Sequence, residues 1–140
     1  MQRLYLKIGP VAGVPVWVHV GWLPLAGVIA WLASSYYVSV GLVGAAGPLH
    51  WLVGLSVAVL FVGMVLLHEL SHAWVARSLG LPLRRVTLTL TGGALKLDDH
   101  DETPGAVFLI ALAGPASTLG VALLCGLVYR FAGTRWPVLS

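Results

Sequence analysis

The chain has 140 residues, of which 59% are hydrophobic and 9% are charged, with a formal net charge of +3. Soluble domains contain about 25% charged residues, so this composition excludes an ordinary soluble fold of this size. The basic residues are too few and too scattered for a nucleic-acid-binding surface, and the single cysteine, Cys125, excludes an intrachain disulfide.

Three stretches are apolar enough to cross a lipid bilayer, which requires about 20 mostly apolar residues in a helix. The first runs from about Trp17 to Val38, the second from about His50 to Ser78, and the third from about Pro104 to Tyr129. Aromatic residues at both ends of the first stretch match the belt found at membrane interfaces. The sequence therefore predicts an α-helical, multi-pass integral membrane protein with about three transmembrane helices.

The basic residues predict the orientation of these helices. Arg3 and Lys7 precede the first helix, and the segment between the first and second helices carries no basic residue. Four basic residues lie between the second and third helices: Arg77, Arg84, Arg85 and Lys96. The positive-inside rule then places the N-terminus and this second connection in the cytoplasm, although two further arginines after the third helix run against the trend.

The second connection has the pattern of a β-hairpin. In "RRVTLTLTGGALKL", Val86, Leu88 and Leu90 alternate with threonines, and this period of two is typical of a strand. Gly92 and Gly93 permit a tight turn, and we expect "ALKL" to return as a second strand. The hairpin either lies on the membrane surface or dips into the protein, where non-helical backbone must be buried or line a wet cavity.

The second expected helix carries the motif "HELSH" at residues 68–72. His68 and His72 are four residues apart, so both imidazoles project from one face and can hold one Zn²⁺. Glu69 is then placed to take a proton from a zinc-bound water and pass it to a leaving amine. Ionisable groups inside a membrane segment are costly and point to function, and a structural polar cluster between helices is the alternative.

Four segments, in this order, resemble the site-2 protease family of intramembrane zinc metalloproteases. The segment "IGPVAGVPVWVHVGW" is similar to the short strand-forming segment before the family's first helix. "LLHELSHAWVARSLG" resembles its second helix with the zinc-binding motif, and "VTLTLTGGALKL" resembles its Gly-Gly hairpin. "TPGAVFLIALAGPASTLGVALL" is similar to its third helix, with a close match at "IALAGP".

The resemblance implies a zinc-dependent metalloendopeptidase that carries out regulated proteolysis of transmembrane protein substrates. By residue-to-residue correspondence, His68 and His72 would be zinc ligands and Glu69 the catalytic base. The hairpin at Gly92 and Gly93 would pair with an unwound substrate as an added strand, which exposes its peptide bond. The alternative function is a non-catalytic membrane scaffold that binds zinc or a partner.

Two departures from the family pattern stand out. The family takes its third zinc ligand from an Asp in an Asn-Pro…Asp-Gly motif, and this sequence has no such motif and no acidic residue after Glu102. We therefore expect residues 1–140 to form one membrane-embedded core that is incomplete at its C-terminus and inactive until a C-terminal half or a partner supplies an Asp. Thr118 also stands where the family often has Asn, which affects a substrate or loop hydrogen bond.

Other candidate residues have simpler interpretations. The acidic segment "DDHDE", residues 98–102, either supplies the missing ligand or, as we favour, forms a solvated loop before the third helix. His19 and His50 lie alone near helix starts, where we expect local hydrogen bonds. Gly114 and Pro115 are expected to kink or pack the third helix rather than to bind a ligand.

Overall fold

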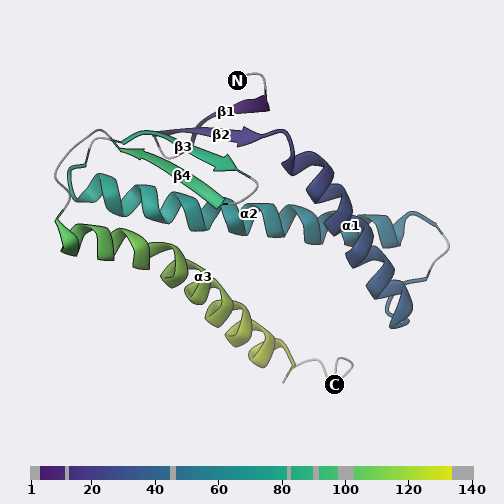
Figure 1. The fold of residues 1–140 in the computed structure, drawn as a ribbon. Coiled ribbons are helices and arrows are strands. Elements are labelled where there is room, and N and C mark those ends of the chain that lie inside the picture. The colour runs from purple at the N-terminus through teal and green to yellow at the C-terminus, as the bar shows by residue number, and fades with distance from the viewer. Residues whose placement is uncertain are drawn as a thin grey trace.

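The computed structural model describes residues 4–11, 13–44, 47–81, 83–89, 92–97 and 103–133. Within these residues the strands are β1 (Tyr5–Val11), β2 (Val14–His19), β3 (Leu83–Thr89) and β4 (Gly92–Leu97). The helices are α1 (Trp22–Ser39), α2 (Leu49–Ser78) and α3 (Pro104–Gly133). Figure 1 shows the sheet and α3 on different sides of the C-terminal part of α2, so α2 is the central element of the fold.

The four strands form one sheet in the order β1-β2-β3-β4. The β3–β4 hairpin confirms the prediction for residues 84–97, and the N-terminal segment also folds as a hairpin rather than as one strand. The two hairpins join through parallel pairing of β2 with β3, in which Trp17 lies opposite Thr87. Parallel strands need a long crossover, and here α1 and α2 together provide it.

Two of the described helices, α2 and α3, are long and apolar enough to cross a membrane, with mean hydropathies of 2.3 and 2.1. The first expected span was too long, because Trp17 lies in β2 and α1 begins only at Trp22. At 1.5 Å per residue, the 18 residues of α1 measure about 27 Å, slightly less than the hydrocarbon core of about 30 Å. A third crossing therefore stays a prediction.

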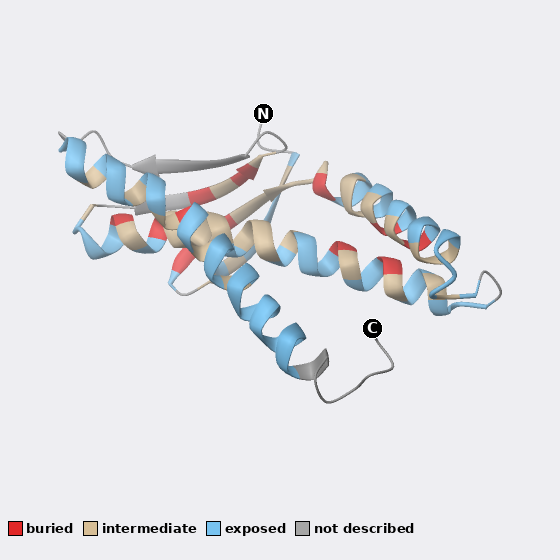
Figure 2. Ribbon diagram, turned by 90° about the horizontal axis from the view of Figure 1, so that it is seen from below, coloured by how far each residue is buried: buried red, intermediate tan, exposed pale blue. Residues whose placement is uncertain are grey.

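Many of the buried residues, red in Figure 2, lie where the sheet meets α2. The buried residues there form two clusters: Val14, Ala73 and Val86 in one, and Val16, Trp22 and Leu88 in the other. Ala73 belongs to α2 and has no exposed surface, so the sheet backbone lies close against this face of the helix. This packing brings the hairpin β3–β4 to the same stretch of α2 that carries the histidines.

Helix α1 packs closely against the N-terminal half of α2. A Cβ atom added at Gly54 would overlap the carbonyl oxygen of Ala30 and would lie 2.9 Å from Cβ of Ser34. The absence of a side chain at Gly54 thus permits the two helix backbones to approach each other. Ser34 is 3% exposed at this contact. The contact between α1 and α2 lies well away from the histidines along α2.

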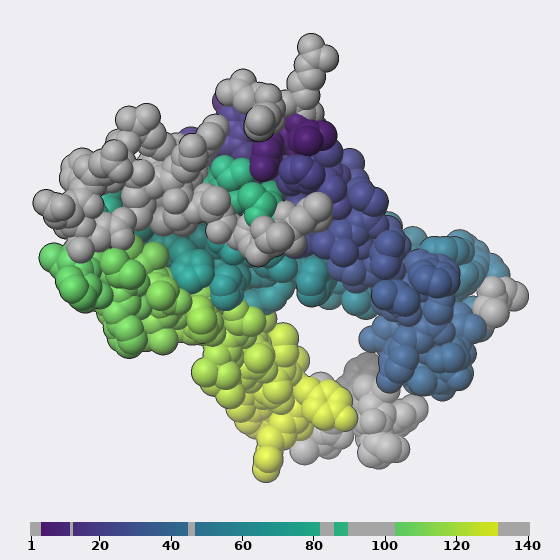
Figure 3. All heavy atoms as spheres, viewed as in Figure 1, coloured from purple at the N-terminus to yellow at the C-terminus, as the bar shows by residue number. Residues whose placement is uncertain are grey.

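Helix α3 runs beside α2 only in its first half and then diverges from α2 (Figures 1 and 3). Beyond the contact, its large apolar side chains are exposed: Leu119, Leu123, Leu124, Leu127 and Val128. An apolar surface of this kind is suited to lipid or to other membrane helices. The first half of α3 is therefore the part that contributes to the site on α2.

Candidate metal centre

His68 and His72 lie one turn apart on α2 and face α3. Their ring centroids are 4.9 Å apart, and the ring planes are inclined at 78°. Both side chains are half-buried. The predicted i, i+4 arrangement on one helix face is therefore present, and α3 closes one side of it.

The Nδ1 atom of each histidine has a hydrogen-bonding partner on α3. His72 Nδ1 lies 2.6 Å from the carbonyl oxygen of Ile110. A carbonyl oxygen only accepts, so this nitrogen carries the ring hydrogen and Nε2 of a neutral imidazole retains its lone pair. His68 Nδ1 lies 2.9 Å from Oγ1 of Thr118, so both rings present their Nε2 atoms on the side away from these partners.

The two Nε2 atoms converge on a space beside Gly114 of α3. A Cβ atom built at Gly114 would lie 2.5 Å from Nε2 of His68 and would overlap Nε2 of His72. Two neighbouring imidazole nitrogens can serve as two ligands of a single Zn²⁺, with Zn–N distances of about 2.0–2.1 Å. The chemistry of these two side chains therefore fits part of a zinc site.

Gly114 allows α3 to lie close against α2, which confirms the predicted packing role, but the sequence did not predict that the packing occurs against His68 and His72. Helix α3 continues without interruption through Pro115 to Gly133. Thr118 contacts His68, whereas the sequence connected this position with a hydrogen bond to a loop or to substrate. The family-like "AGP" segment was the one signal that could have indicated these roles, because it places a glycine four residues before Thr118.

Glu69 is half-buried and lies on α2 between the histidine face and the face that meets the sheet. Ala73 and Ala76, one and two turns further along the same side of the helix, have no exposed surface. A carboxylate at this position is next to His68 in the sequence but lies on a different face of α2. This placement agrees with a base beside a metal rather than with a third ligand.

A third ligand is not found in the part of the chain that the structure describes. No group of three or more His, Cys, Asp or Glu side chains there could hold a metal ion. The acidic segment at residues 98–102 lies outside the described residues, so its candidacy as a ligand stays open. Hydrolytic zinc sites normally have three protein ligands, so His68 and His72 are an incomplete set.

The two other predicted histidines differ in their surroundings. His19 accepts a hydrogen bond from the backbone N–H of Gly21 at 3.0 Å, which confirms a local role before α1. His50 lies at the opposite end of α2 from the motif, and its buried Nδ1 has no hydrogen-bonding partner among the described residues. Among the described residues, Nδ1 of His50 therefore does not make the expected local hydrogen bond.

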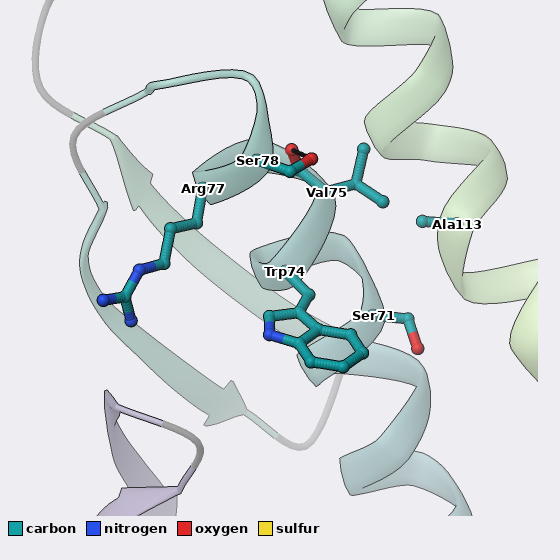
Figure 4. A pocket seen from close by; sticks show the side chains of 6 residues that line it. All are labelled: Ser71, Trp74, Val75, Arg77, Ser78 and Ala113. Atoms are coloured by element: carbon teal, nitrogen blue, oxygen red, sulfur yellow. Dashed lines mark hydrogen bonds between the residues drawn. The ribbon is translucent and has the colours of Figure 1, made fainter.

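A cavity of about 430 Å³ opens between the end of α2 and α3, and its lining begins at Ser71, the residue before His72 (Figure 4). Its lining is mostly apolar and consists of Ser71, Trp74, Val75, Arg77, Ser78 and Ala113. Arg77 extends away from α3, and its Nη1 donates to the carbonyl oxygen of Gly13 at 3.4 Å. The cavity therefore presents an apolar surface beside the site and adds no metal ligand.

Gly92 and Gly93 lie at the start of β4, where their backbones pair with Thr89 and Leu88 of β3. Strand β4 is at the edge of the sheet, so one side of its backbone has no strand partner among the described residues. The end of β3 is attached to α1, because Nε1 of Trp22 donates to the carbonyl oxygen of Thr89 at 3.3 Å. A role of this hairpin in substrate binding stays a prediction.

Comparisons with known proteins assign the chain to a family. The family model for peptidase family M50 matches residues 56–134. "Putative zinc metalloprotease Rip3" of Mycobacterium tuberculosis is 38% identical over 140 residues, which cover 99% of this chain and 35% of the relative. "Putative zinc metalloprotease sll0528" of Synechocystis sp. is 31% identical over 133 residues, covering 95% and 34%. The chain spans about a third of the length of these relatives, and no solved structure matches it significantly.

Proposed function

This chain belongs to peptidase family M50, the site-2 protease family of membrane-associated zinc metalloproteases, and we propose that it forms the zinc site of an intramembrane protease. The observation that carries this proposal is the convergence of the Nε2 atoms of His68 and His72 beside Gly114. The two apolar helices that meet there support a site within the membrane.

His68 and His72 would hold Zn²⁺ through Nε2, while their Nδ1 atoms keep their hydrogen bonds to α3. Zn²⁺, when bound, supplies Lewis-acid polarisation of the scissile carbonyl and makes water a stronger nucleophile. The Glu69 carboxylate would accept the proton of the attacking water and deliver it to the leaving amine. The position of Glu69 beside His68, between the histidine face and the sheet face of α2, supports this proposed role.

An additional carboxylate completes the metal site in this proposal. This chain covers 35% of the length of the Mycobacterium tuberculosis relative, so that relative is roughly three times as long as the matched part. We propose that an Asp from a C-terminal half or a partner closes the coordination that two histidines begin. Residues 1–140 alone would then bind zinc more weakly than the complete site and would not cleave peptide bonds.

The substrate of the proposed enzyme is a transmembrane protein whose helix has unwound. The free edge of β4 at Gly92 and Gly93 offers backbone donors and acceptors to an added strand. The apolar cavity next to Ser71 and Ala113 offers space for apolar side chains of such a segment. In this proposal the protein is multi-pass and its N-terminus is cytoplasmic, as the basic residues indicate.

Cleavage of a transmembrane reporter by the complete protein tests the proposal. Glu69→Gln preserves shape but removes the base, and loss of general-base catalysis typically costs about 10²–10⁴-fold in rate. We expect cleavage to fall by this factor while the zinc content stays at the wild-type value. Unchanged cleavage in Glu69→Gln would contradict the proposal, and a zinc-loaded wild type without cleavage would favour the non-catalytic scaffold.

A further inference from the structure

The hydroxyl group of Thr118 has two hydrogen-bonding neighbours. Its Oγ1 lies 2.9 Å from Nδ1 of His68 and 2.9 Å from the carbonyl oxygen of Gly114, to which it donates. A hydroxyl group carries a single hydrogen, and a carbonyl oxygen has none to give. With that hydrogen directed at Gly114, the oxygen of Thr118 can only accept from His68.

This arrangement determines which nitrogen of His68 carries the ring hydrogen. Nδ1 must be the donor to Thr118, so Nε2 of the neutral ring is left with its lone pair. Nε2 is also the atom that lies against Gly114, close to Nε2 of His72. We propose that Thr118 is a positioning residue that holds His68 in the orientation and tautomer in which Nε2 can bind the metal.

The neighbouring hydroxyl provides a comparison within the same turn of α3. Ser117 Oγ donates to the same carbonyl oxygen of Gly114 at 2.7 Å. Among the described residues, however, Ser117 makes no hydrogen bond to His68. Ser117→Ala removes a hydroxyl group that bonds to the same carbonyl oxygen but leaves the contact between Thr118 and His68 in place, so it is a matched control.

The inference rests on the proposed zinc site and concerns the groups that contact the metal-binding histidines but not the metal. Groups that hold the non-coordinating nitrogen of a ligating histidine fix its ring, and their loss typically costs about 10–100-fold in metal affinity. The Ile110 carbonyl performs this task for His72 but is part of the backbone. Thr118 is the side chain through which the effect can be measured.

The experiment measures the apparent zinc Kd of the full chain in detergent by competition with a chromophoric chelator. Thr118→Val removes the acceptor at nearly constant volume, and Thr118→Ala is a second variant in case valine prevents folding. Both should weaken zinc binding by about tenfold, the lower end of the usual range. Thr118→Ser, which restores the hydroxyl, and Ser117→Ala should both stay close to wild type.

The outcomes separate this inference from the proposed function. Wild-type zinc affinity in Thr118→Val and Thr118→Ala would overturn the positioning role and leave the zinc site standing. Equal weakening in Ser117→Ala would also overturn it, because the effect would then come from the helix rather than from His68. A wild-type chain that binds no zinc would overturn both the zinc site and this inference.

Discussion

The Nδ1 atom of His72 lies 2.6 Å from the carbonyl oxygen of Ile110, so a hydrogen bond joins the metal-binding face of α2 to the backbone of α3. Thr118 makes a second connection of this kind to His68. Gly114 lies between these two connections in the sequence and leaves the space that both rings face. The site therefore depends on how α3 packs, and the HELSH motif provides only half of it.

Gly114→Ala tests whether the space beside the histidines is needed. The added methyl group would overlap the Nε2 atoms of both His68 and His72, so we expect zinc content to fall close to zero. Gly120→Ala is the matched control, because a Cβ atom there meets no atom within 4 Å. Metal analysis of the purified variants would contradict the assignment if Gly114→Ala retained the zinc content of Gly120→Ala.

Gly54→Ala tests the close approach of α1 and α2. The new Cβ atom would overlap the carbonyl oxygen of Ala30, and overpacking of this kind costs about 1–3 kcal/mol. We expect a lower thermal unfolding temperature in detergent. Gly63→Ala on the same helix meets no atom within 4 Å and should unfold at or above the wild-type temperature. Equal unfolding temperatures for the two variants would show that the helices pack less closely.

Trp22→Phe tests the attachment of β3 to α1. The indole is 8% exposed, and its Nε1 donates to the carbonyl oxygen of Thr89. Phenylalanine keeps most of the buried ring but removes the donor, which should lower the free energy of unfolding by about 1 kcal/mol. Trp31→Phe is the control, since Trp31 is 56% exposed. The same loss in both variants would argue against a specific role for this hydrogen bond.

Gly93→Val tests the hairpin as a place where substrate pairs. A β-branched side chain would obstruct close approach of a second backbone to the edge of β4, where Gly93 lies opposite Leu88. In the complete protein, reporter cleavage should fall while zinc content stays unchanged. Zinc content measured on the same sample separates this effect from damage to the metal site. Wild-type cleavage by Gly93→Val would leave the hairpin with a structural role only.

Local sequence patterns were sufficient for the central elements of the fold. The predicted span from His50 to Ser78 matches α2 almost residue for residue, because an uncharged apolar run of that length has few other stable structures in a membrane. The hairpin followed from a period of two and a Gly-Gly pair. The error at the first helix arose in "VPVWVH", whose apolar residues suit a membrane helix as well as the strand that they form.

Relations between distant segments could not be predicted in the same way. The parallel pairing of Trp17 with Thr87 depends on how two intervening helices return the chain to the sheet. His68, Glu69 and His72 could be proposed as candidate site residues from their spacing within one helix. Thr118 and Gly114 join the site only because α3 packs on α2. The residue pattern of neither helix predicts that contact.

The zinc content of the purified full chain is the most direct test of the central claim. Metal analysis should find zinc in the wild-type protein and almost none in the double variant His68→Ala/His72→Ala. The matched control is His19→Ala/His50→Ala, which removes the same number of imidazoles at positions away from the site and should retain wild-type zinc. Equal zinc in the His68→Ala/His72→Ala variant and the wild type would contradict the account.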